Sequence, residues 1–248
     1  MGQTGKRLID HTSLPRAERL TEKEEVQIRA ETEAFEDFLD RLEEIPPHPC
    51  RTDGGSLVGT DTSRSSTSPN LVLEAYRETI LAVDHWEDEY RERTAHASIE
   101  HEFGPEVAAG LAGGSATWSQ PLWNQIKSAA EDAVEIRQRS YSLMAAERQQ
   151  LDELRSSLTD VSDVLAAIER GEFAFDESNG RLTSIRQKLD ELTHDQQSYL
   201  HRRNRTNEEL FTTYVYADLD TEYPGLAALA TARQLLERIE LRHWAGMS

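Results

Sequence analysis

The chain is poor in several residue types that build compact or chemically active proteins. Its 248 residues include a single cysteine, Cys50, which excludes an internal disulfide and a multi-cysteine metal site. Hydrophobic residues make up only 37% of the chain, and no stretch approaches the 18 apolar residues of a membrane-spanning helix. The N-terminus also lacks the apolar segment of a signal peptide. We therefore expect a cytoplasmic protein without membrane association.

Lysine is scarce as well. Four residues are lysine and the other 23 basic residues are arginine, against 46 acidic residues, so the net charge is -19. This composition suits concentrated salt, where the screening length falls to roughly 3 Å at 1 M. Alternatively, the acidity serves a basic partner. Nucleic acid is not an expected partner, because its phosphates repel an acidic chain.

The short motifs of common enzyme classes are missing too. The sequence has no phosphate-binding glycine loop, no G-x-S-x-G and no H-E-x-x-H. No nucleophile can be placed beside a base. We therefore expect neither an enzyme nor a bound cofactor.

The most regular pattern is a heptad repeat between Gln120 and Thr213. Its positions are separated alternately by three and four residues: Met144, Glu147, Leu151, Leu154, Leu158, Val161, Leu165 and Ile168, then Leu182, Ile185, Leu189, Leu192, Gln196 and Tyr199. The repeat predicts two long helices that form an antiparallel coiled-coil hairpin, with the turn over residues 171–181.

The repeat also predicts which residues face each other. Folding the chain about residue 175 pairs residues whose numbers sum to about 350, so that Leu165 faces Ile185. The same register places Glu147 opposite Arg203. We interpret this pair as a structural polar layer, which typically lowers stability while it fixes the register.

The rest of the chain reads as helices and loops. Residues 1–18 predict a flexible arm, and Thr21 to Glu24 predicts a capping box that begins a helix. This helix is expected to end at Pro46-Pro47, because neither proline can donate the next backbone hydrogen bond. Residues 48–68 are rich in Gly, Ser and Thr and predict a disordered loop.

We expect a single all-α domain over residues 19–248, in which a helical head carries the long hairpin at 120–213. The head would comprise residues 19–45, 69–112 and 220–244.

Two stretches carry a family resemblance. One contains Ala75-Tyr76-Arg77-Glu78-Thr79-Ile80 and Glu102-Phe103-Gly104-Pro105, and the other contains Tyr214-Val215-Tyr216-Ala217-Asp218. With the heptad hairpin between them, the chain resembles an uncharacterised family of halophilic archaea, a domain of unknown function. The resemblance implies habitat and domain extent, but no catalytic residue, ligand or activity.

A second group of residues suggests metal chemistry. His85, Glu89, His96, Glu100 and His101 combine imidazoles and carboxylates at helical spacing, which are ligand types for Zn²⁺. However, His96 and His101 are five residues apart and lie on different faces of a straight helix. The alternative is that these are surface residues, with His85 at a helix end.

Aromatic residues of the head predict either a core or a ligand pocket: Tyr76, Trp86, Tyr90, Phe103, Trp118 and Trp123.

Our first hypothesis is a non-catalytic coiled-coil interaction or scaffold protein. The outward positions of the hairpin would pair with a protein partner or form a homodimer. Phe173 and Phe175, at the predicted tip, mark a contact point or fold over the turn. The alternative is a ligand-sensing or metal-binding helical bundle that uses the region from His85 to His101.

Overall fold

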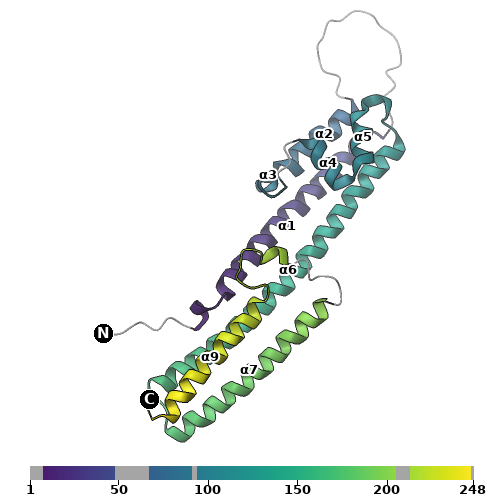
Figure 1. Ribbon diagram of the computed structural model, residues 1–248. Coiled ribbons are helices and arrows are strands. Elements are labelled where there is room, and N and C mark those ends of the chain that lie inside the picture. The colour runs from purple at the N-terminus through teal and green to yellow at the C-terminus, as the bar shows by residue number, and fades with distance from the viewer. Residues whose placement is uncertain (1–7, 48–66, 91–93, 205–212, 247–248) are drawn as a thin grey trace, which may run out of the picture. The chain divides into compact units, whose positions relative to one another are not determined.

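The protein is all-α in the part that the structure describes. The computed structural model describes residues 8–47, 67–90, 94–204 and 213–246 (Figure 1). The 3₁₀ helices there are η1 (Leu8–His11), η2 (Ile80–Ala82) and η3 (Gly114–Ala116). The α-helices are α1 (Leu14–Glu43), α2 (Ser68–Glu78), α3 (Trp86–Tyr90), α4 (Ala95–Phe103), α5 (Pro105–Ala112), α6 (Gln120–Glu169), α7 (Phe175–Asn204) and α9 (Pro224–Trp244). No strand occurs in these ranges, so the predicted fold class is confirmed.

The chain forms two compact units. Unit 1 comprises Met1–Glu24 and Leu143–Ser248, and unit 2 comprises Glu25–Ser142. The long helices α1 and α6 each contribute residues to both units. That residues 19–248 act as one domain stays a prediction.

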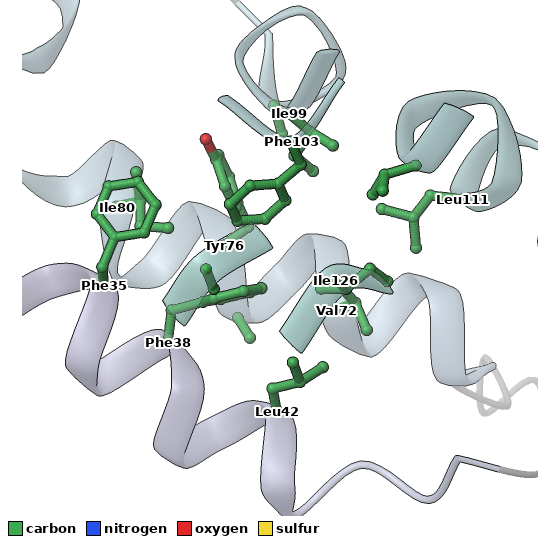
Figure 2. Close-up of a cluster of buried hydrophobic side chains, with 14 of the residues drawn as sticks. Phe35, Phe38, Leu42, Val72, Tyr76, Ile80, Ile99, Phe103, Leu111 and Ile126 are labelled. Atoms are coloured by element: carbon green, nitrogen blue, oxygen red, sulfur yellow. The ribbon is translucent and has the colours of Figure 1, made fainter. Parts of the chain in front are cut away.

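Unit 2 is organised around an aromatic cluster (Figure 2). Helices α1, α2 and α4 supply Phe38, Tyr76 and Phe103, whose rings contact one another with centroids 5.6 to 5.8 Å apart. The buried Tyr76 hydroxyl lies 2.9 Å from Ser98 Oγ, so its polar atom is satisfied inside the core. The aromatic residues expected in a head therefore form a packed core.

Two further aromatic residues, Trp118 and Trp123, form hydrogen bonds near the end of α1. The helix ends at Glu43, just before Pro46-Pro47, as predicted from the missing proline donors. The indole N–H of Trp118 donates to the carbonyl of Pro46 at 3.1 Å, and that of Trp123 donates to Leu42 at 3.2 Å. The two tryptophans thus bind the chain where α1 ends, and the carbonyl of Leu42 also accepts the N–H of Ile45 at 3.1 Å.

The N-terminal region differs from the expected flexible arm at 1–18. Residues 1–7 lie outside the described part, but η1 forms at Leu8 and α1 begins at Leu14 rather than at Thr21. Leu8, Ile9 and Leu14 are buried in unit 1, and this burial anchors a stretch whose composition is mostly polar. The Thr21 hydroxyl donates to the carbonyl of Glu18 within the helix, so the predicted capping box is wrong.

The turn between α6 and α7 is shorter than the predicted 171–181. Gly171 has φ = 71°, its N–H donates to the carbonyl of Ile168, and the N–H of Glu172 donates to Ala167. These two bonds are the pattern by which a left-handed glycine ends a helix. The Asn179-Gly180 pair, predicted to lie in the turn, is inside α7. Of the predicted loop 48–68, residues 48–66 lie outside the described ranges.

The terminal helix α9 belongs to unit 1, not to the head in which we placed residues 220–244. Figure 1 shows it alongside α7, and Arg233 Nη2 of α9 lies 2.5 Å from Asp190 Oδ1 of α7. A side chain at Gly225 would meet Gln196 Nε2 at 2.8 Å, so the glycine permits the close approach of the two helices. An amphipathic sequence indicates that a helix has a buried face, but not which helices cover that face. Coiled-coil packing along the heptad seam stays a prediction.

Candidate functional site

Unit 2 contains a buried carboxylate, and both of its oxygens have polar partners. Glu31 of α1 accepts hydrogen bonds on Oε2 from Arg137 Nε at 2.9 Å and from the Tyr90 hydroxyl at 3.0 Å. His85 Nε2 lies 2.9 Å from the other oxygen, Oε1. Arg137 also donates to Glu102 through Nη1 and Nη2, at 3.3 and 3.1 Å. One guanidinium therefore joins two carboxylates in the interior.

The electrostatics of this cluster favour the charged form of Arg137 and the neutral form of Tyr90. Burial acts to lower the pKa of Arg137, but the carboxylates of Glu102 and Glu31 outweigh it and raise that pKa. Burial raises the pKa of the Tyr90 hydroxyl, and the Glu31 carboxylate raises it further. The guanidinium also lies over the Phe35 ring, 4.2 Å from its centroid. The arrangement stabilises a core and presents no activated nucleophile.

The residues proposed for a metal site do not converge. His85 contacts Glu31, whereas His96 is exposed on α4 and His101 lies on the same helix with its ring 6.5 Å from that of Tyr90.

The other proposed metal ligands add nothing to a site. Glu100 is exposed, and the side chain of Glu89 lies outside the described part. Among the described residues, no group of three or more His, Cys, Asp or Glu side chains is arranged to hold a metal ion.

Unit 1 contains a second buried carboxylate, and here the structure brings predicted partners together. Arg203 Nη1 of α7 donates to Glu147 Oε2 of α6 at 2.6 Å, in the register expected from the heptads. The Tyr199 hydroxyl donates to the same oxygen at 2.9 Å, and the Tyr216 hydroxyl donates to Oε1 at 2.8 Å. That this layer fixes the register of the hairpin stays a prediction.

Both tyrosines of this cluster are held neutral. Burial raises the pKa of Tyr216, and the adjacent Glu147 carboxylate raises it further. The same two causes, in the same order, raise the pKa of Tyr199. The hydroxyl groups therefore act as hydrogen-bond donors to a charged acceptor, which are the stronger kind of hydrogen bond.

The end of unit 1 near the turn exposes apolar side chains. Phe175 is 52% exposed, Leu241 72% and Trp244 63%. The Phe175 ring stacks on the buried His243 ring at 4.3 Å and meets the Trp244 ring edge-on at 5.9 Å. We call Phe175, Leu241, His243 and Trp244 the aromatic end. The other predicted tip residue, Phe173, is half-buried under the Arg181 guanidinium.

A groove in unit 1 lies between η1, α6 and α9. Its volume of about 630 Å³ is within the range of small-molecule sites. However, its ionisable side chains are all exposed: His11, Asp163, Glu169, Arg170 and Arg238. Its buried hydroxyl, Ser162 Oγ, already accepts the N–H of Leu8 at 3.3 Å. The groove therefore lacks buried polar groups that await a ligand in the described part.

The sequence predicted part of these clusters. Glu147 and Arg203 follow from heptad spacing, but the Tyr216 hydroxyl was missed because the chain between α7 and α9 has no repeat. Glu31 and Arg137 were missed as well, since they are 106 residues apart and share no local pattern.

Comparison with known proteins places this all-α chain in a family. The sequence matches the family described as a domain of unknown function, DUF7260, over residues 12–240, and the chain belongs to that family. The resemblance to an uncharacterised family is therefore confirmed. No curated protein and no solved structure gives a match. No helix in the described ranges is both long and apolar enough to span a membrane.

Proposed function

We propose that this chain is a non-catalytic interaction protein that acts by self-association through its hairpin unit, unit 1. The observation that carries the proposal is the aromatic end. Phe175, Leu241 and Trp244 are exposed together in a chain whose mean hydropathy is only -0.67. Exposed apolar groups that touch one another mark contact surfaces more often than isolated ones do.

The interior charges support this proposal. Glu31 and Glu147 each accept several hydrogen bonds from residues of their own unit, so their chemistry is structural. The His85 ring is engaged by Glu31, and this contact favours a role in stability over one in metal binding.

The position of α9 restricts the surface of unit 1 that is open to a partner. We expected the outward positions of the hairpin to pair with another helix, but on one side of α7 that helix is α9 of the same chain. Arg186 and Arg233 make ion pairs between these two helices, with Glu240 and Asp190. A partner is therefore accommodated at the end of the unit rather than along this seam.

We further propose that the protein works in concentrated salt, in the cytoplasm of a halophilic archaeon. The excess of 46 acidic over 27 basic residues supports this, because their mutual repulsion is screened in molar salt. The free energy of unfolding is expected to rise as KCl is raised from 0.1 to about 2 M. A fall over that range would contradict the proposal.

Light scattering coupled to size exclusion in about 2 M KCl tests the proposed function. A mass near twice 28.1 kDa at high protein concentration is the expected result. A mass near 28.1 kDa at every concentration would contradict self-association. The alternative of metal binding is tested separately, by adding Zn²⁺ and following the melting temperature, which is expected not to change.

A further inference from the structure

The first part of the described chain lies along α6 in unit 1. The N–H of Leu8 donates to Ser162 Oγ at 3.3 Å, and Arg155 Nη1 lies 2.6 Å from Glu18 Oε2. As the chain proceeds from Leu8 to Glu18, its partner moves back along α6 from Ser162 to Arg155, so the two segments run antiparallel. The 3₁₀ helix η1 also contacts α9. We call residues Leu8–Glu24, the described part of unit 1 that precedes unit 2, the N-terminal strap.

Apolar contacts hold the strap in place. Leu14, Ala17 and Thr21 are fully buried and recur at helical spacing, so one face of this part of α1 is covered. Leu8 borders the groove of unit 1 together with Leu165 of α6, and both side chains are buried. The strap therefore covers apolar surface that its release would open to solvent.

Two polar atoms of the strap oppose this docking. Ser13 Oγ and Glu18 Oε1 are buried and have no hydrogen-bond partner in the part of the chain that the structure describes. Ser13 precedes the first residue of α1, a position where a serine hydroxyl commonly accepts a backbone N–H. A buried polar atom without a partner costs free energy, which is recovered when water reaches the atom. Release of the strap therefore returns both atoms to water.

Glu18 also brings a charge into the interior. Its side chain is 13% exposed, whereas that of Arg155 is 52% exposed, so the carboxylate is buried while its cation lies near the surface. Burial raises the pKa of Glu18, and Arg155 offsets this effect only in part. Asp152 of α6 raises the same pKa further by its like charge. The ion pair thus does not compensate fully for the burial of the carboxylate.

We infer that the N-terminal strap is a releasable element, which opens from α6 and α9 while the rest of unit 1 stays folded, and that the charge of Glu18 favours its release. The strap ends where α1 passes from unit 1 into unit 2, so the opening stops at a boundary between compact units. Release uncovers Ser162, Leu165 and the groove beside them. The strap therefore controls access to this face of unit 1, whether or not the protein self-associates.

Hydrogen exchange followed by mass spectrometry in about 2 M KCl measures the release. Amides of the strap are expected to exchange at least about 100-fold faster than those in the centre of α9, because they open without unfolding of the unit. Equal protection of the two segments would overturn the inference.

Two substitutions separate the charge of Glu18 from its ion pair. Glu18→Gln keeps the shape of the side chain and removes its charge, and is expected to slow exchange of the strap about threefold. Arg155→Gln leaves the buried carboxylate without its cation and is expected to speed exchange about threefold. The matched control is Glu22→Gln, which removes an exposed carboxylate of the same strap and is expected to change nothing. If Glu18→Gln speeds exchange as Arg155→Gln does, the ion pair holds the strap closed and the role of Glu18 is overturned.

A single thiol tests whether release uncovers the groove. In a chain whose natural cysteine is removed by Cys50→Ser, Ser162→Cys places a thiol beneath the strap and Asp163→Cys places one at an exposed neighbouring position. Labelling at position 162 by a disulfide reagent is expected to be at least about 100-fold slower than at 163. It is also expected to slow with Glu18→Gln and to speed up with Arg155→Gln. A labelling rate at 162 that equals the rate at 163, or that neither substitution changes, would contradict the inferred release.

Discussion

The two units of the molecule stabilise a buried carboxylate with different sets of hydrogen-bond donors. Each contains a buried glutamate that accepts hydrogen bonds from an arginine and from tyrosine. In unit 2 the arginine, Arg137, is shared between Glu31 and Glu102, whereas in unit 1 Glu147 receives Arg203 and two tyrosine hydroxyls. The comparison teaches that unit 2 relies on its cation to balance charge, while unit 1 relies more on neutral donors.

Removing the shared cation, Arg137, is expected to have the largest effect on stability. Arg137→Met leaves the carboxylates of Glu31 and Glu102 buried without their guanidinium, and is expected to lower the free energy of unfolding by about 3–5 kcal/mol. The measurement is guanidinium unfolding followed by ¹⁹F NMR of 5-fluorotryptophan. Trp86, Trp118 and Trp123 report unit 2, and Trp244 reports unit 1.

The matched control for this change is Arg139→Met, two residues further along α6. Arg139 is exposed and pairs only with Glu135 among the contacts described, so its loss is expected to cost less than about 0.5 kcal/mol. If both variants cost the same, the shared cation is not what holds unit 2 together.

Removing a neutral donor should have a smaller effect. Tyr216→Phe keeps the buried ring and removes a hydrogen bond to Glu147, at an expected cost of about 1.5–3 kcal/mol. Tyr90→Phe makes the same change at Glu31 and is expected to cost less, because Tyr90 is only partly buried. Fluorine spectra of Trp244 and of the other three tryptophans measure the two losses. A larger loss of stability in Tyr90→Phe than in Tyr216→Phe would contradict this prediction.

Alkaline pH is expected to lower the stability of the two units by different amounts, without any mutation. The pKa values of Tyr90, Tyr199 and Tyr216 are raised above the ordinary value of about 10, so the stabilising effect of each hydroxyl is complete below pH 10 and is lost as the pH rises above that. Each such tyrosine contributes a slope of at most about 1.4 kcal/mol per pH unit. Unit 1 has two of them and unit 2 has one among the described residues. The free energy of unfolding monitored at Trp244 should therefore fall about twice as steeply with pH as that monitored at the tryptophans of unit 2.

The control for the alkaline titration is Tyr216→Phe, which leaves one titrating hydroxyl on Glu147. Its slope above pH 10 is expected to fall to that of unit 2. An unchanged slope would show that Tyr216 does not titrate with folding.

The smallest effect concerns the histidines. His85→Ala removes one contact to Glu31 and is expected to cost about 1–2 kcal/mol, whereas the exposed His96→Ala is expected to cost less than about 0.5 kcal/mol. Added Zn²⁺ is expected to leave the melting temperature of both variants and of the wild type unchanged. A Zn²⁺-dependent rise that His85→Ala abolishes would instead establish a metal site.

The sequence predicted those features that depend on local spacing. The heptads placed Glu147 opposite Arg203, and the proline pair located the end of α1. It could not predict that α9 lies on α7, because an amphipathic helix shows that one face is buried but not against what. The contact of Glu31 with Arg137 was also beyond reach, since it joins residues 106 positions apart. The buried Leu8 and Ile9 were hidden within a polar stretch.

The most direct test of self-association through unit 1 uses the same four fluorotryptophans in a dilution series in about 2 M KCl. If the aromatic end is the contact surface, the Trp244 resonance shifts with protein concentration while those of Trp86, Trp118 and Trp123 stay fixed. If the unit 2 resonances move, or if none moves up to millimolar protein, the account is contradicted.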